Sequence, residues 1–154
     1  MTNLRIRVSW VAVAAAILAG TVATPALGSA AFQGMQIDGS IPIDMTQMKA
    51  AVPLEIAASA IAFQPVEVTL EDNPKKSEKT VHLKLKYRNS SDRDYFMYST
   101  ANLLDAGGQV IATKSKKTKA DDDDNASVSF KFKLPYAAAE RVKKVAFKFA
   151  LEKD

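Results

Sequence analysis

Hydrophobic and polar residues alternate at every second position in three stretches of the chain, residues 80–88, 126–134 and 143–151. Successive side chains of a β-strand point to opposite faces, so a period of two predicts strands with one buried face and one solvent-exposed face. The positions expected to point inward are Val81, Leu83, Leu85, Tyr87, Val128, Phe130, Phe132, Leu134, Val145, Phe147, Phe149 and Leu151.

Turn residues divide the rest of the chain into further short strands. Residues 31–54 form an irregular lead-in with one short edge strand over 35–43, and residues 55–70 are strand-like with an interruption near Pro65. Polar turns follow at 71–78 and 89–94, a Gly-containing hairpin turn at 105–108, and one short helical turn at 136–141. About seven antiparallel strands with this spacing predict an all-β, immunoglobulin-like β-sandwich over residues 55–154, and an open jelly-roll or small barrel is the alternative topology.

Residues 114–125 have the most uneven composition, because four lysines are followed by the acidic run Asp121–Asp124. Such a stretch predicts a solvent-exposed loop that is dispensable to the fold. A calcium site is the alternative, although adjacent carboxylates do not match the alternating ligands of an EF-hand loop. Whether the acidic run binds a cation stays open.

The turn and hairpin of the central region carry a family resemblance. Asn89-Ser90-Ser91-Asp92, followed by Leu104-Asp105-Ala106-Gly107-Gly108 and an extended stretch over 110–113, resembles bacterial extracytoplasmic immunoglobulin-like domains of the FxLYD type and related uncharacterised families. The resemblance is clearest over residues 79–113. It implies a sandwich fold and an attachment, ligand-binding or accessory role, with no shared catalytic residues.

The amino terminus has the organisation of a secretory signal peptide over residues 1–30. Arg5 and Arg7 precede an apolar run over residues 8–23, and small residues follow to residue 31. Cleavage is expected to leave a mature chain that begins between Gly28 and Phe32, and an uncleaved membrane anchor is the alternative. The chain has no cysteine. We therefore expect a protein secreted or held in a bacterial periplasm, with no stable membrane span after processing.

Charge is informative only locally. The formal net charge is +4, but removal of the two signal-peptide arginines leaves 19 basic and 17 acidic side chains, a net charge of +2. This value gives no indication of nucleic-acid binding. The outward positions of the three alternating strands are nevertheless rich in basic residues, which would bind an anionic polymer or an acidic envelope protein if the strands were neighbours. The candidate binding residues are Lys84, Lys86, Arg88, Lys131, Lys133 and Lys148.

Catalytic chemistry has little support in the sequence. No candidate nucleophile can be matched with a candidate general base, and the single histidine, His82, falls on a polar strand face. A carboxylate pair is the one catalytic arrangement that the abundance of Asp and Glu leaves open. We therefore expect a non-catalytic binding or accessory module of the cell envelope without cofactor or metal. The alternative is a secreted protease inhibitor that acts through the exposed 114–125 loop.

Overall fold

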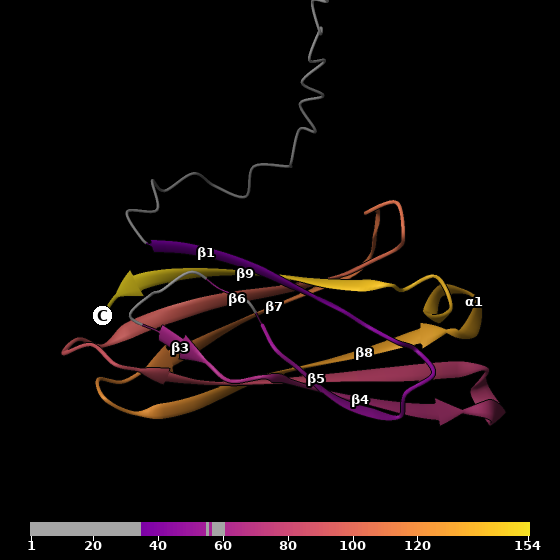
Figure 1. Ribbon diagram of the computed structural model, residues 1–154, viewed down its shortest axis with the longest axis horizontal. Helices are drawn as coiled ribbons and strands as arrows, with labels where there is room; N and C mark the ends of the chain where they lie inside the picture. Colours follow the sequence, from indigo (N-terminus) through magenta and orange to yellow (C-terminus); the bar gives the residue numbers. More distant parts are fainter. Residues whose placement is uncertain (1–34, 55, 57–60) are drawn as a thin grey trace, which may run out of the picture. The chain divides into compact units, whose positions relative to one another are not determined.

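The computed structural model describes residues 35–54, 56 and 61–154, which form two antiparallel β-sheets (Figure 1). In spatial order, sheet A consists of β1 (Met35–Pro42), β9 (Lys144–Lys153), β6 (Tyr95–Leu104) and β7 (Val110–Ala120). Sheet B consists of β2 (Lys49–Val52), β4 (Val66–Asn73), β5 (Glu78–Asn89) and β8 (Asn125–Pro135), with the short β3 (Ile61–Phe63) also paired to β5.

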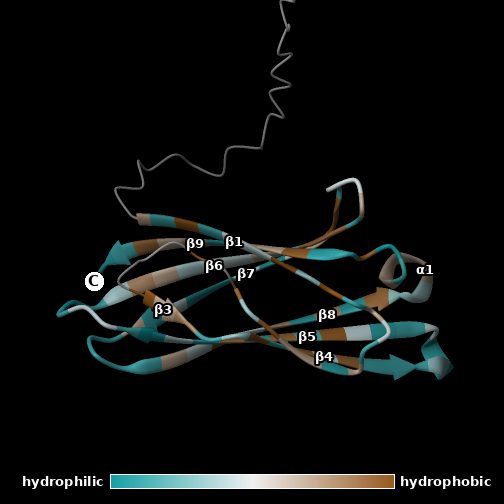
Figure 2. Cartoon of the chain, in the orientation of Figure 1, coloured by the Kyte–Doolittle hydropathy of each residue, from teal (hydrophilic) through white to brown (hydrophobic). Residues whose placement is uncertain are grey.

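The hydrophobic faces of the two sheets pack against each other, so the prediction of an all-β sandwich is confirmed. All twelve positions expected to point inward are buried, and Figure 2 shows hydrophobic and hydrophilic residues alternating along β5. Aromatic rings connect the two layers: the ring centroids of Phe63 in sheet B and Phe149 in sheet A are 4.5 Å apart. Phe130 and Phe147 make a second contact between the sheets at 6.5 Å.

The lead-in contributes more to the sheets than the sequence predicts. The edge strand expected over residues 35–43 is present as β1, which pairs with β9 along its whole length. β2 was not predicted, and it pairs with β4 at the edge of sheet B. Ile37 and Ile41 of β1 belong to the hydrophobic core. Nine strands therefore lie in the described residues, against about seven expected.

The predicted turns are present, but the one expected over residues 71–78 is shorter, because residues 71–73 belong to β4 and pair with the start of β5. The carboxylate of Asp105 accepts hydrogen bonds from the backbone N–H groups of Gly107 and Gln109, both at 2.9 Å, and closes the β6–β7 hairpin. Gly108 has a φ of 81°, a left-handed conformation that glycine adopts without steric cost. The short helical turn is α1 (Tyr136–Ala139), between β8 and β9. Pro65 separates β3 from β4, as expected.

The loop expected over residues 114–125 is a wrong prediction. β7 continues to Ala120 and pairs with β6 as far as Tyr95, which leaves only residues 121–124 as a turn. The physical reason is that β7 lies at the edge of sheet A. Within the described residues, β7 has a neighbouring strand on one side only, so its long charged side chains reach solvent around the open side and the usual alternation is lost.

The predicted signal peptide, residues 1–30, lies outside the described residues. Within the described part of the chain, no helix has the length and hydrophobicity needed to cross a membrane.

Candidate functional site: a lysine-rich face of sheet B

The outer face of sheet B is built by three neighbouring strands, β4, β5 and β8. In β5 the even-numbered side chains point outward, because their odd-numbered neighbours are buried in the core. The antiparallel register places His82 opposite Lys131 and Lys84 opposite Ser129 of β8. On the other side of β5, Glu67 of β4 is opposite Lys84. β8 begins at Asn125, long after β5 ends at Asn89, yet the three strands present one continuous polar surface.

Three of the predicted binding residues lie together on this face without an acidic partner. Lys84, Lys131 and Lys133 are exposed, and none of them forms an ion pair within the described residues. Their ammonium groups are therefore available to a ligand.

Two other predicted residues lie on the same face but have acidic partners. The Lys86 ammonium donates to Glu67 at 2.6 Å, and this hydrogen bond and charge hold the pKa of the Glu67 carboxyl below its usual value. Arg88 Nη2 lies 2.9 Å from the carboxylate of Asp123 in the turn before β8. Both cations are thereby partly neutralised before any ligand approaches.

Lys148 lies elsewhere. It belongs to β9, so it projects from the outer face of sheet A. There it lines a separate hollow with Asp38 and Tyr98. The structure therefore brings together five of the six predicted residues and separates the sixth.

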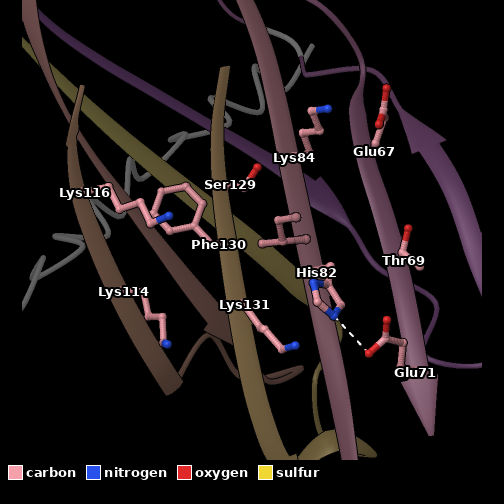
Figure 3. A pocket seen from close by; sticks show the side chains of 11 residues that line it. Glu67, Thr69, Glu71, His82, Lys84, Lys114, Lys116, Ser129, Phe130 and Lys131 are labelled. Carbon is pink, nitrogen blue, oxygen red and sulfur yellow. Dashed lines mark ion pairs between the residues drawn. The ribbon is translucent and has the colours of Figure 1, made fainter. Parts of the chain in front are cut away.

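Sequence reasoning missed two lysines of the site, Lys114 and Lys116. They lie on β7, directly opposite Ala101 and Ser99, two buried positions of β6. Both lysines therefore occupy positions on the inner face of sheet A. Their side chains extend toward β8, at the adjacent edge of sheet B (Figure 3). The Lys114 ammonium is 6.0 Å from the ring centroid of Phe132 in β8. Their alternation with Ser115 was the available signal, but it lacked the hydrophobic residues that mark a strand.

Side chains from β4, β5, β7 and β8 surround a hollow of about 520 Å³, which we call the lysine hollow. Its basic side is formed by Lys114, Lys116 and Lys131, from β7 and β8, and Figure 3 shows Lys84 projecting from β5 nearby. Its opposite side is formed by three residues of β4, whose side chains are acidic or hydroxylated. These are Glu67, Thr69 and Glu71.

The centre of the lysine hollow contains the only histidine of the chain. His82 Nε2 lies 3.1 Å from a carboxylate oxygen of Glu71 (Figure 3). Four lysines and two glutamates line the hollow, which gives it a net charge of +2 with His82 neutral. The net charge of the hollow thus equals the net charge of the whole expected mature chain.

Two carboxylates of the acidic run after β7 pair with basic side chains, Asp121 with Lys119 and Asp123 with Arg88. Lys119 Nζ is 2.9 Å from Asp121, 3.1 Å from Asp94 and 3.2 Å from Asp154, and hydrogen bonds to these three carboxylates raise the pKa of Lys119. Among the described residues, no group of three or more His, Cys, Asp or Glu side chains is arranged to hold a metal ion.

Comparison with known proteins identifies no relative: no protein-family model matches the chain, and no curated protein shows significant similarity to it.

Proposed function

We propose that this chain is an exported, non-catalytic binding module of a bacterial cell envelope, which binds anionic ligands through the outer face of sheet B. The observation that carries the proposal is the gathering of Lys84, Lys131 and Lys133 on one face without acidic partners. A rigid two-sheet scaffold holds these charges in place. The signal-peptide organisation of residues 1–30 and the resemblance to extracytoplasmic sandwich domains support a location in the envelope.

Unpaired lysines also have a structural role, since charged side chains on exposed strands keep a sheet soluble and discourage pairing with other chains. The two roles differ in one measurable respect. A ligand-binding face concentrates a specific set of charges, whereas a solubility function is shared by every exposed lysine. The test must therefore compare equal charge losses from the two sheets.

The experiment measures capture of anionic envelope material by the parent protein and by two triple variants. Lys84→Gln, Lys131→Gln and Lys133→Gln remove three charges from sheet B, and Lys144→Gln, Lys148→Gln and Lys153→Gln remove three exposed charges from β9. Each exposed charge pair changes an affinity by at most about fivefold. We expect the sheet B variant to bind roughly tenfold more weakly and the β9 variant to bind like the parent.

Salt provides a second measurement. Exposed charges are screened beyond about 10 Å at 0.1 M ionic strength, so capture by the parent should fall steeply as salt is raised. Thermal unfolding of both triple variants checks that the fold is retained. Equal loss in the two variants, or capture that is insensitive to salt, would show that the face is not the binding site.

The protease-inhibitor alternative loses its structural basis. It required an exposed loop over residues 114–125, and most of that stretch is the paired strand β7.

A further inference from the structure

We infer that the lysine hollow binds an acidic polysaccharide, with the negative groups of the chain against β7 and β8 and its sugar hydroxyls against β4. This inference rests on the proposed function and adds the ligand class and the residues that select it. It depends on Lys114 and Lys116, which belong to the other sheet and lie outside the set of residues on which the proposed function stands.

The first argument is the number of unpaired cations. Lys84, Lys114, Lys116 and Lys131 line the hollow from three strands, and none of them forms an ion pair within the described residues. One exposed charge pair changes an affinity by about fivefold at most, so a small ligand with a single carboxylate would bind too weakly to be retained. Several anionic groups on one chain engage several lysines at once, and the individual factors then multiply.

The second argument is the division of the hollow into a basic and an acidic side. Glu71 on β4, and Glu67 to the extent that Lys86 leaves it charged, make this side unfavourable for a ligand with closely spaced negative charges along its whole length, such as polyphosphate. Carboxylates and the hydroxyl groups of Thr69 and Ser129 instead accept hydrogen bonds from neutral hydroxyls. A polymer whose sugar rings each carry an anionic group and free hydroxyls satisfies both sides. β8 and β4 lie two strand spacings apart, about 10 Å, so a chain that runs along β5 between them can turn its anionic groups toward the lysines and its hydroxyls toward the carboxylates.

The third argument distinguishes a polysaccharide from a membrane surface. The hollow is a concave feature, and it is lined by polar side chains apart from the buried Leu83 and Phe130. Stable binding at a membrane interface combines electrostatic attraction to anionic lipids with the insertion of exposed apolar side chains. The exposed large hydrophobic residues of the described chain are Met35, Met48 and Val110, and none of them lines the hollow. A flexible chain follows a concave site more closely than a flat lipid surface does.

The experiment measures binding of defined oligogalacturonate, an acidic oligosaccharide, by isothermal titration calorimetry. It uses the protein in the form that its host exports, and the comparison ligands are neutral dextran, inorganic polyphosphate of equal charge and vesicles of phosphatidylglycerol. We expect oligogalacturonate to bind more tightly than polyphosphate, and dextran and vesicles not to bind.

Two matched double variants locate the site. Lys114→Gln with Lys116→Gln should weaken oligogalacturonate binding about tenfold, since each lysine contributes a few-fold. Lys144→Gln with Lys148→Gln removes the same charge from the outer face of sheet A and should change the affinity less than twofold. If the first variant unfolds, Lys114→Arg with Lys116→Arg keeps the charge on β7, and it should bind within twofold of the parent.

The outcomes separate this inference from the proposed function. If the β7 variant binds like the parent while the Lys84, Lys131 and Lys133 variant loses binding, anion binding by sheet B stands and the assignment of the hollow is overturned. Preference for polyphosphate or for vesicles over oligogalacturonate overturns the ligand class in the same way. Failure of every anionic probe to bind overturns both proposals.

Discussion

At the scale of single residues, the buried polar side chain of Asn89 connects several segments by hydrogen bonds. It is fully buried at the end of β5, and its Nδ2 donates to the backbone oxygens of Arg93, at 2.7 Å, and Ala120, at 3.1 Å. Its Oδ1 accepts from the backbone N–H of Ser91. One side chain therefore connects the turn before β6 to the end of β7. Satisfying its polar atoms in this way is what makes its burial tolerable.

Replacing Asn89 with Ala should therefore destabilise the fold by about 2–3 kcal/mol, because two carbonyl groups and one N–H group lose their partner at a buried position. Urea unfolding measures the effect. Asn102 is the matched control, since its side chain accepts one exposed hydrogen bond, from Thr113 at 2.8 Å, and Asn102→Ala should cost less than about 1 kcal/mol. Similar losses in the two variants would mean that the Asn89 network does not stabilise the turn.

At the scale of elements, the β6–β7 hairpin depends on the charge of Asp105. Hydrogen bonds from the backbone N–H of Gln109, from Arg141 and from the backbone N–H of Gly107 lower the pKa of Asp105 from its ordinary value of 3.8. A carboxyl whose pKa is lower in the folded than in the unfolded state stabilises the fold above its unfolded pKa. That contribution disappears as the pH falls through the folded value.

The variant Asp105→Asn keeps the shape of the side chain and removes its charge. The parent should have the higher melting temperature from pH 7 down to about pH 4, and the difference should shrink as the pH falls further, toward pH 2. Asp92→Asn is the control, because the Asp92 side chain is 95% exposed and this change should leave the melting temperature unaltered. A difference between parent and Asp105→Asn that stays constant from pH 7 to pH 2 would contradict the role of the charge.

β7 is the strand whose charged composition led to the wrong prediction of a loop. Its residues pair with buried positions of β6, including Met97, Ser99 and Ala101. Its lysines are compatible with this place because the strand lies at an edge of the sheet. The same lysines make β7 a poor target for pairing with another chain.

Replacing residues 114–119 with Gly-Ser-Gly-Ser-Gly-Ser should destabilise the fold by about 3 kcal/mol, since each glycine in a strand costs up to about 1 kcal/mol and the lysine stems are also lost. Residues 121–124 form the turn after β7, and Asp123 has a left-handed φ of 52°. Their replacement with Gly-Ser-Gly-Ser puts glycine at that position and should cost no more than about 1 kcal/mol. Denaturant unfolding of both variants decides whether the stretch is a strand or a dispensable loop.

At the scale of the whole molecule, the exposed lysines differ in whether they have an acidic or aromatic partner. The outer face of sheet B and the adjoining β7 edge carry the lysines that lack acidic partners around the hollow. In sheet A, Lys117 lies over the rings of Phe96 and Tyr98, and Lys119 is surrounded by three carboxylates. Paired and unpaired cations therefore occur on both sheets: Lys86 and Arg88 of sheet B have acidic partners, whereas Lys144 and Lys148 of sheet A form no ion pair within the described residues. The net charge of the chain does not show this difference.

The sequence by itself determined the buried side of each main strand. Val81, Phe130 and Phe147 belong to strict alternations, and a shift of one residue would expose the hydrophobic residues of an entire strand. The turns at Asn89 and Asp105 were equally predictable, because their side chains bond to nearby backbone within a few residues. In all these cases the deciding interactions are local, or they depend only on which face is hydrophobic.

Only the tertiary structure decided which strands are neighbours, and with it the composition of the site. Lys131 and Lys148 occupy equivalent outward positions in sequence, yet β8 joins sheet B and β9 joins sheet A. Lys114 and Lys116 enter the hollow because the β7 edge of sheet A adjoins the β8 edge of sheet B. Strand order is fixed by the packing of two complete sheets against each other, so no single segment of the sequence contains it.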